Sequence, residues 1–241
     1  MRQQPARQLY RMRAMDATLV WLKRDLRLRD PASLHAAQGA RAAAAVYVIE
    51  PDWLASAEFS SSHLQITLQC LAELRSALAA RGLPLLVRVG AVPAVFDALQ
   101  RRFPFTQLLS HEETGPGWTR ARDLEVAAWC RARGVAWQAV PQTAVVRRLR
   151  GRAGWAGRWA RRKDAPALPA PSVFHGAAAF SLADLPDLPT PAALGVAPPW
   201  QALQPVGEDA AWSTLAGFLA GRGPSSARPT TRRPSSTSAL R

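Results

Sequence analysis

Polar and aromatic side chains that could hold a ligand stand just after short apolar segments of this chain. They are Arg24, Asp25, Glu50, Asp52, Trp53, His111, Glu112 and Glu113. If the apolar segments are parallel strands, their carboxyl ends meet at one edge of a sheet, where such folds bind ligands. The residues would then form a polar rim with one aromatic wall. This pattern indicates a binding site and not a complete catalytic centre.

Several familiar chemistries are excluded by the motifs that the sequence lacks. The four histidines, His35, His63, His111 and His175, are scattered and lack the spacing of metal ligands. No glycine-rich dinucleotide or phosphate loop follows a strand, and no Gly-x-Ser-x-Gly turn occurs. We therefore expect no metal site and no hydrolase-type nucleophile.

The rim residues also have a purely structural interpretation. Arg24 and Asp25 would then form an ion pair that holds the loop after the first strand. For His111, Glu112 and Glu113 the binding and the structural interpretations both remain open on sequence grounds.

The elements that must position the rim are five short apolar segments that alternate with helix-like segments. The predicted strands are Leu19–Leu22, Ala43–Ile49, Pro84–Val89, Gln107–His111 and Ala136–Val140. Short apolar runs without alternation are typical of parallel strands covered on both faces. With helices as crossovers, they predict an α/β fold with a doubly wound five-stranded parallel sheet.

Two details of the predicted helices bear on the site. Asp30 is the expected N-cap of the first helix, with Pro31 at its first position. A later helix runs from about Trp118 to Arg133. Its inward face is predicted to carry Leu124, Ala127, Ala128 and Cys130.

The composition limits the class of protein and its partners. Apolar residues make up 48% of the 241 residues, enough for a packed core, and the net charge of +14 favours polyanionic partners. No apolar run is long enough to cross a membrane. Cys70 and Cys130 stand far apart, which predicts two reduced thiols in a cytoplasmic protein.

Three segments carry a family resemblance. Residues 19–34 read Leu-Val-Trp-Leu-Lys-Arg-Asp-Leu-Arg-Leu-Arg-Asp-Pro-Ala-Ser-Leu, and this run is similar to the opening strand and loop of the photolyase/cryptochrome family. Residues 110–115, followed by Thr-Arg-Ala-Arg-Asp at 119–123, look like its loop and helix after the fourth strand. Residues 146–162 contain Gly-Trp-x-x-Arg-Trp, like its inter-domain segment.

The resemblance implies a Rossmann-like antenna domain that holds a deazaflavin, flavin or folate at the rim. Some folate-binding members carry a Glu where this chain has Thr119, which argues against folate. In intact members a separate helical domain binds FAD and carries the catalytic residues, and light drives repair of pyrimidine dimers in DNA or signalling. We expect this chain to lack that domain, and so to be inactive as a carbon–carbon lyase by itself.

The resemblance and the composition together predict five regions. Residues 1–17 form a disordered leader, with either Met1 or Met15 as the start, and 18–145 form the antenna domain. A basic, then Pro- and Ala-rich linker covers 146–206, and 207–221 begin the helical domain. The tail 222–241 lacks acids, aromatic residues and periodicity, which predicts disorder or a shifted reading frame.

The basic stretch keeps two further functions open. Arg158, Arg161 and Arg162 could contact DNA phosphates beside Trp155 and Trp159, or the tryptophans could dock on another domain. The alternatives are a free-standing pterin- or flavin-binding protein that works with a separately encoded FAD domain, and a basic DNA-binding accessory protein.

Overall fold

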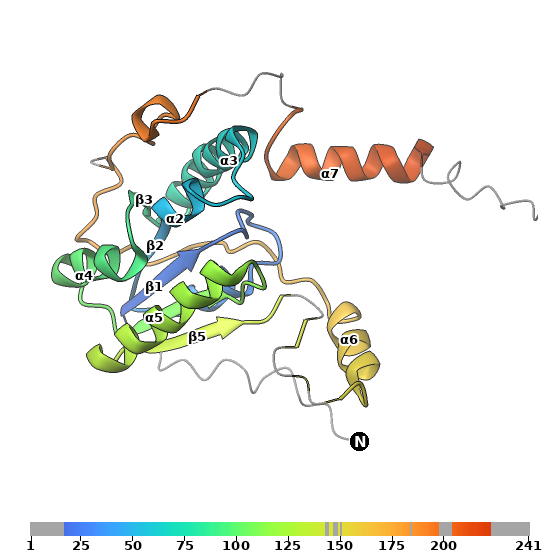
Figure 1. The fold of residues 1–241 in the computed structure, drawn as a ribbon, viewed down its shortest axis with the longest axis horizontal. Coiled ribbons are helices and arrows are strands. Elements are labelled where there is room, and N and C mark those ends of the chain that lie inside the picture. The colour runs from blue at the N-terminus through green and yellow to red at the C-terminus, as the bar shows by residue number, and fades with distance from the viewer. Residues whose placement is uncertain are drawn as a thin grey trace, which may run out of the picture.

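A five-stranded parallel sheet with helices on both faces forms the body of the protein (Figure 1). The computed structural model describes residues 17–142, 145–146, 149, 151–183, 185–197 and 204–222. The strand order is β3-β2-β1-β4-β5, so the chain winds outward from β1 in one direction and then in the other. The predicted doubly wound α/β fold is confirmed.

The elements follow the predicted order closely. The strands are β1 Ala17–Leu22, β2 Ala42–Ile49, β3 Leu85–Val89, β4 Gln107–His111 and β5 Ala136–Val140. The helices within the sheet domain are α1 Ala32–Ala37, α2 Pro51–Leu54, α3 Ser61–Ala79, α4 Val92–Arg102 and α5 Gly117–Arg133. Beyond them lie α6 Trp155–Lys163, a 3-10 turn Ala192–Leu194, α7 Glu208–Gly217 and a π-turn Phe218–Arg222.

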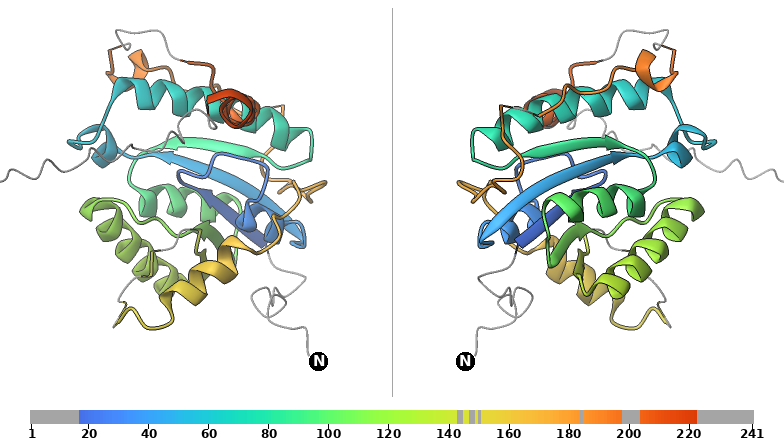
Figure 2. Two further views of the ribbon diagram at one scale, coloured as in Figure 1. Left: turned by 90° about the vertical axis from the view of Figure 1, so that its right-hand side faces the viewer. Right: turned by 90° about the vertical axis from the view of Figure 1, so that its left-hand side faces the viewer.

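Both faces of the sheet are buried, which explains the continuous apolar runs. Leu19 and Trp21 of β1 pack in one core with α4 and α5, and Val20 and Leu22 pack in the other with α1 and α3. Figure 2 shows the sheet edge-on between the helices of its two faces. Successive side chains of a strand point to opposite faces, so a strand buried on both sides must be apolar throughout.

The inward face of α5 differs from the prediction. Leu124 is 58% exposed and Ala128 is also exposed, whereas Arg122 and Trp129 are buried. Thr119, Arg122, Val126, Trp129 and Cys130 share the buried face. Arg122 points inward because its guanidinium forms ion pairs with carboxylates at the strand ends. Helical periodicity cannot indicate such partners.

The expected N-cap at Asp30 is also wrong. The cap residue of α1 is Pro31, and no side chain caps this helix. Asp30 has a φ of 57°. Its carboxylate accepts a hydrogen bond of 2.9 Å from the backbone N–H of Leu168, and its own N–H donates to the Leu168 carbonyl. Asp30 therefore ties a distant segment to the loop after β1.

Part of the predicted linker packs into the domain. Gly176 pairs with Ala43 at the start of β2, and the rings of Phe174 and Phe180 are buried in opposite cores of the sheet. A Cβ on Gly176 would stand 2.2 Å from the carbonyl oxygen of Gly82. This close backbone approach requires glycine, and it makes the segment an integral part of the fold.

Several predictions concern residues outside the described ranges. The leader before Ala17, the arginines Arg147, Arg148 and Arg150, and the tail after Arg222 fall there. The interpretations of these segments stay predictions.

Candidate functional site

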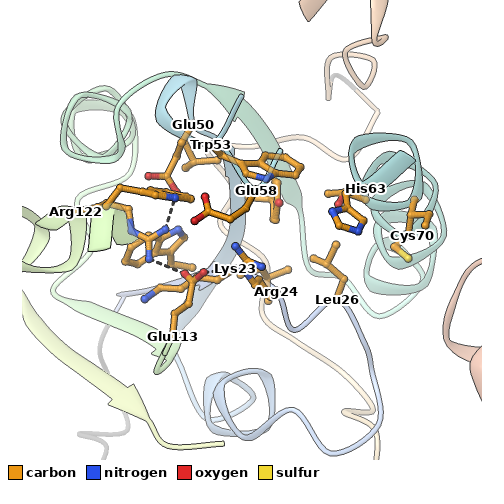
Figure 3. A pocket seen from close by; sticks show the side chains of 17 residues that line it. Lys23, Arg24, Leu26, Glu50, Trp53, Glu58, His63, Cys70, Glu113 and Arg122 are labelled. Atoms are coloured by element: carbon orange, nitrogen blue, oxygen red, sulfur yellow. Dashed lines mark hydrogen bonds and ion pairs between the residues drawn. The ribbon is translucent and has the colours of Figure 1, made fainter. Parts of the chain in front are cut away.

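A cavity of about 450 Å³ opens at the carboxyl ends of β1 and β2, beside the point where the winding of the sheet reverses (Figure 3). The loop after β4 and the start of α5 close one end, and α3 forms the other. The lining residues are Trp21, Leu22, Lys23, Arg24, Leu26, Tyr47, Val48, Glu50, Trp53, Glu58, His63, Ile66, Thr67, Cys70, Glu113, Trp118 and Arg122.

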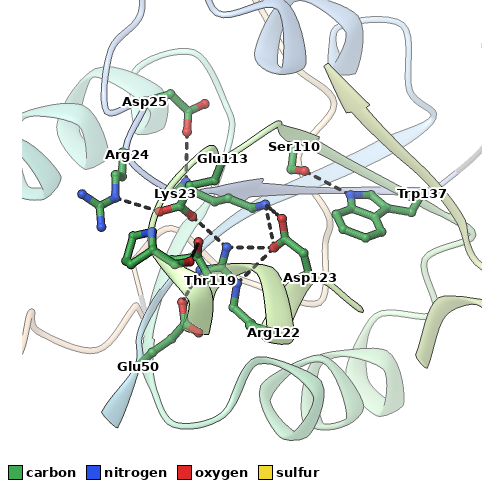
Figure 4. A network of polar contacts seen from close by, with 11 residues as sticks. Lys23, Arg24, Asp25, Glu50, Ser110, Glu113, Thr119, Arg122, Asp123 and Trp137 are labelled. Atoms are coloured by element: carbon green, nitrogen blue, oxygen red, sulfur yellow. Dashed lines mark hydrogen bonds and ion pairs between the residues drawn. The ribbon is translucent and has the colours of Figure 1, made fainter. Parts of the chain in front are cut away.

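Arg122 is the centre of a buried ion network at the base of this cavity (Figure 4). Its guanidinium donates to Glu50 Oε1 at 2.7 Å and to Glu113 Oε2 at 2.7 Å. It also donates to Asp123 Oδ1 at 2.8 Å. A planar guanidinium has five donors in fixed directions, so one arginine can hold carboxylates from three segments.

Two further cations complete the network. Lys23 Nζ donates to Asp123 Oδ1 at 3.1 Å and is almost fully buried. Arg24 Nε donates to Glu113 Oε1 at 2.8 Å, but its side chain is 60% exposed. Arg24 thus lies at the mouth of the cavity, where it can meet an anionic group of a ligand.

Tryptophan rings line the charged end of the cavity. Lys23 Nζ lies 4.1 Å from the ring centroid of Trp21, and Arg122 lies over the rings of Trp21 and Trp118 at 4.8 and 5.6 Å. Trp53 packs edge-to-face on Phe59 at 5.8 Å. Cation–π contacts hold Trp21 and Trp118 to the network, and Trp53 is the aromatic wall contributed by α2.

Burial changes the protonation chemistry of the site. Desolvation raises the pKa of Glu50 to about 7, and Arg122 only partly opposes this effect. Desolvation also lowers the pKa of Lys23, against the attraction of Asp123. At neutral pH, Glu50 therefore populates two forms. The protonated form can donate a hydrogen bond, and the ionised form accepts hydrogen bonds.

Asp25 and His111 form a separate pair beneath the rim. His111 Nδ1 contacts Asp25 Oδ2, and both side chains are at most 2% exposed. The backbone N–H of Lys23 donates to Asp25 Oδ1 at 3.0 Å. This pair links the loop after β1 to the end of β4 without lining the cavity.

The structure brings together only part of the predicted rim. Arg24, Glu50, Trp53 and Glu113 line the cavity, whereas Asp52 and Glu112 do not. The alternative Arg24–Asp25 ion pair is also not formed, because the two side chains have the different partners described above. Arg158, Arg161 and Arg162 lie together on α6, and none of them lines the cavity.

Several important residues were absent from the predicted site. Arg122 and Asp123 form the end of the Arg-x-Arg-Asp run that carried the family resemblance, and Lys23 precedes the predicted Arg24. Sequence patterns could not show that these charged residues pair with one another. A charged residue normally faces solvent. His63 and Thr67 line the cavity from α3 without any local signal of binding.

A second cavity of about 760 Å³ lies between the loop after β1, α3 and the start of α7. Glu208 accepts hydrogen bonds from the N–H groups of Leu28 and Arg29 at 2.7 and 2.9 Å, and Arg29 pairs with Asp209 at 3.0 Å. These contacts anchor α7 to the sheet domain. Leu26 and Cys70 line both cavities.

The comparisons with known proteins agree with the α/β fold. The family model for DNA photolyase matches residues 18–150, more than half of the chain. The chain belongs to the DNA photolyase family. Comparison with curated protein sequences finds no match.

Three solved structures share the fold. A class III photolyase from Agrobacterium tumefaciens has a TM-score of 0.67 at 18% identity, over 86% of this chain and 45% of that one. The cryptochrome of Synechocystis sp. PCC6803 has a TM-score of 0.63 at 20% identity, over 88% and 48%. The archaeal photolyase from Sulfolobus tokodaii, solved with two FAD molecules, has a TM-score of 0.55 at 18% identity, over 67% and 38%. The matches thus span less than half of each of these proteins.

Two features are absent from the described ranges. No helix there has both the length and the apolar character needed to cross a membrane. Within the same ranges, no group of three or more His, Cys, Asp or Glu side chains could hold a metal ion.

Proposed function

We propose that the cavity at the ends of β1 and β2 binds an antenna chromophore, a deazaflavin, flavin or folate. The domain would serve a photolyase or cryptochrome whose FAD-binding part lies outside the residues described here, in the same chain or in a separate one. The whole protein would repair pyrimidine dimers in DNA, or signal, under blue light in the cytoplasm. Two free cysteines support that compartment.

One observation carries the proposal: an aromatic, charged cavity opens at the carboxyl edge of a doubly wound sheet. Ligands of such sheets bind at this place, and a volume of about 450 Å³ lies within the range of small-molecule sites. Trp53 offers an aromatic surface for a planar ring. Leu26 and Ile66 add apolar contacts on the side of α3.

The polar groups fit the edge of a pteridine or flavin ring. Such rings carry an N–H donor beside a carbonyl acceptor, and Glu50 can accept from the first or donate to the second because its pKa is about 7. Arg24 stands at the mouth and suits an anionic side chain of the chromophore. The bound chromophore would supply absorption of near-ultraviolet or blue light.

The residues of this chain would bind, orient and shield that ring. The Arg122 network holds Glu50 and Glu113 in fixed positions, so the cavity needs little reorganisation on binding. Thr119, at the position where some folate-binding relatives have Glu, is buried and donates to the Pro116 carbonyl. Glu50 and Glu113 are therefore the carboxylates that would contact the chromophore ring at the charged end of the cavity.

The proposal is tested by equilibrium binding of three chromophores to the purified chain. Riboflavin, an 8-hydroxy-5-deazaflavin and methenyltetrahydrofolate are titrated separately, and binding is followed by the chromophore's own absorption and fluorescence. We expect one of them to bind with a dissociation constant in the micromolar range. Trp53→Ala should weaken that binding about tenfold, since it removes the aromatic wall.

Trp212→Ala is the matched control because Trp212 lies on α7 and is 49% exposed. It should leave the affinity unchanged. The proposal fails if none of the three chromophores binds at millimolar concentration. It also fails if one binds but Trp53→Ala and Trp212→Ala behave alike.

A further inference from the structure

One short segment borders both the cavity at the ends of β1 and β2, named here the chromophore cavity, and the attachment of helix α7. Residues 23–30 follow β1, and we name them the β1 loop. Near its start, Arg24 lines the chromophore cavity. Toward its end, the backbone N–H groups of Leu28 and Arg29 donate to the Glu208 carboxylate in the first turn of α7. The loop therefore contacts two sites that lie far apart in the sequence.

Helix α7 is attached to the sheet domain at its first turn. Glu208 accepts the two loop N–H bonds at 2.7 and 2.9 Å, and Asp209 pairs with Arg29 at 3.0 Å. The Arg29 guanidinium also lies 5.8 Å from the ring centroid of Trp212. Among the described residues, none that belongs to α7 is buried, and Figure 1 shows the helix projecting from the domain. Such a helix can undock without disturbing a packed core, so it has a docked and an undocked state.

A glycine brings the start of α7 against α3 as well as against the loop. Gly207, the N-cap of α7, has a φ of 107°, and a Cβ there would collide with the carboxylate of Glu73 on α3. Burial raises the pKa of the Cys70 thiol on the same helix, and a hydrogen bond with the Gly207 backbone opposes this rise. Docking of α7 therefore places Gly207 directly beside Cys70.

Leu26 and Cys70 form a wall that two cavities share. Both side chains line the chromophore cavity and also the second cavity, which extends to Gly207 and Glu208. Leu26 is half-buried and packs against the core that contains the inner face of α3. Because closely packed side chains transmit displacements to their neighbours, a shift of this wall changes the shape of both cavities.

Hydrogen bonds within the β1 loop connect its two ends. The N–H of Lys23 donates to the Asp25 carboxylate at 3.0 Å, and the N–H of Arg27 donates to the Asp25 carbonyl at 2.9 Å. The Arg27 guanidinium donates to the carbonyls of Arg29 and Asp30 at 3.0 and 3.1 Å. These bonds make the loop one connected unit, so release of its far end should loosen its start.

We propose that the β1 loop couples the docking of α7 to the chromophore cavity. With α7 docked, Glu208 holds the loop, Leu26 completes the shared wall and Arg24 is fixed at the mouth. With α7 undocked, two loop N–H groups lose their acceptor and the cavity becomes less ordered, so that binding must first order it. Regulation of chromophore affinity in this way rests on the proposed function, whereas the coupling itself can be measured in the empty protein.

Coupling between two sites acts equally in both directions. If docked α7 strengthens chromophore binding by some factor, the bound chromophore must strengthen docking by the same factor. A partner or domain that holds α7 against the loop would thereby tighten chromophore binding.

The first arm of the test uses the full chain without chromophore and follows amide hydrogen exchange residue by residue by NMR. Glu208→Ala removes the acceptor of the Leu28 and Arg29 N–H groups, so exchange should accelerate at both. It should also accelerate, by about threefold or more, at Lys23 and Arg27, whose N–H groups are bonded inside the loop.

Glu125→Ala is the matched control, because it removes the same charge from an exposed position on α5. It should leave exchange throughout the β1 loop unchanged. Arg29→Ala is a second variant that weakens docking by removing the pair with Asp209. It should accelerate exchange at Lys23 and Arg27 in the same direction as Glu208→Ala.

The second arm measures affinity with riboflavin, the 8-hydroxy-5-deazaflavin and methenyltetrahydrofolate, each titrated into the same variants. Glu208→Ala should weaken binding of the chromophore that the wild type binds by about fivefold, and Glu125→Ala by less than about twofold. In the wild type, saturation with that chromophore should slow exchange at Leu28 and Arg29 by a similar factor. These two residues do not line the chromophore cavity, so the ligand does not cover them directly.

Accelerated exchange confined to the two N–H groups that Glu208 accepts, with Lys23 and Arg27 at their wild-type rates, would overturn the coupling. Equal chromophore affinity of the wild type and Glu208→Ala would also overturn it, as would equal effects of Glu208→Ala and Glu125→Ala. If none of the three chromophores binds, the proposed function fails. The exchange rates at Lys23 and Arg27 then still decide whether the loop couples α7 to the cavity.

Discussion

Arg122 and Glu50 are separated by 72 positions in the chain, yet the guanidinium donates to the carboxylate at 2.7 Å across the base of the cavity. Glu50 follows strand β2, and Arg122 lies on the buried face of α5. Because the same guanidinium also holds Glu113, this one side chain joins the ends of two strands to a helix. The shape of the candidate site depends on it.

Replacing Arg122 by alanine should strongly destabilise the fold. The change leaves Glu50 and Glu113 buried without their shared cation, and breaking such a buried pair typically costs about 3–5 kcal/mol. Urea unfolding at pH 8 measures the free energy of unfolding. Arg120→Ala, an exposed position on the same helix, should change it by less than about 0.5 kcal/mol. A cost below about 1 kcal/mol for Arg122→Ala would contradict the role assigned to the network.

Glu50 should make the protein less stable as pH rises from about 4.5 to 7. Burial raises its folded-state pKa to about 7, so the folded protein keeps a proton that the unfolded chain releases near its usual pKa. The resulting stability is complete below that lower value and is lost as pH passes through 7. Each pH unit in this window is worth about 1.4 kcal/mol, which gives a total of roughly 3–4 kcal/mol.

Glu50→Gln isolates this contribution because it removes the titrating group with little change of shape. The free energy of unfolding of wild type minus that of Glu50→Gln should fall between pH 4.5 and 7.5. Glu58→Gln, which removes a carboxylate from another position of the same cavity, serves as the control. A flat difference for Glu50→Gln would show that its pKa is not raised.

Asp25 should have the opposite pH dependence. Desolvation acts to raise its pKa, but hydrogen bonds from His111 and from the Lys23 N–H outweigh that effect and lower it. A depressed folded-state pKa contributes stability above the usual aspartate pKa, and this stability is lost as pH falls through the lower, folded-state value.

Asp25→Asn should therefore cost about 2–3 kcal/mol at pH 7, and the difference from wild type should shrink as pH falls below about 4. The exposed Asp52 provides the matched control, because Asp52→Asn should be neutral within about 0.5 kcal/mol. Equal effects of the two substitutions in guanidinium chloride unfolding would contradict a structural role for the Asp25–His111 pair.

Gly176→Ala should destabilise the domain although the residue lies beyond the segment matched by the family model. The added Cβ would meet the Gly82 carbonyl oxygen at 2.2 Å, which forces the segment away from β2 and disturbs the nearby Phe174. We expect a loss of about 2–4 kcal/mol, measured by thermal unfolding. Gly117→Ala, where nothing lies within 4 Å of the new Cβ, should leave the melting temperature unchanged or slightly higher.

Local sequence patterns predicted the sheet well and the site only in part. All five strands were predicted, and the bounds of β4 and β5 agree with the structure. The rim residues at the strand ends were found from the topology of parallel sheets. Which of them reach the cavity depends on loop conformation, so Asp52 and Glu112 were included although they lie outside it.

The residues that the patterns missed have partners far away in the chain. By sequence Arg122 resembles an exposed helical charge, but in the fold it lies beside Glu50 and Glu113. In the same way, Asp30 resembled a helix cap, but its carboxylate binds the N–H of Leu168, 138 positions later. Local spacing carries no information on such pairs.

The sequence by itself determined the strands, the doubly wound parallel class of the sheet and the edge at which a ligand site would form. Strands buried on both faces must be apolar, and that requirement is visible within a few residues. Only the tertiary structure decided that Arg122 faces inward, that Asp25 pairs with His111 and that Gly176 closes against Gly82. These contacts form because folding brings distant segments together in a medium where each buried charge or polar group needs a partner.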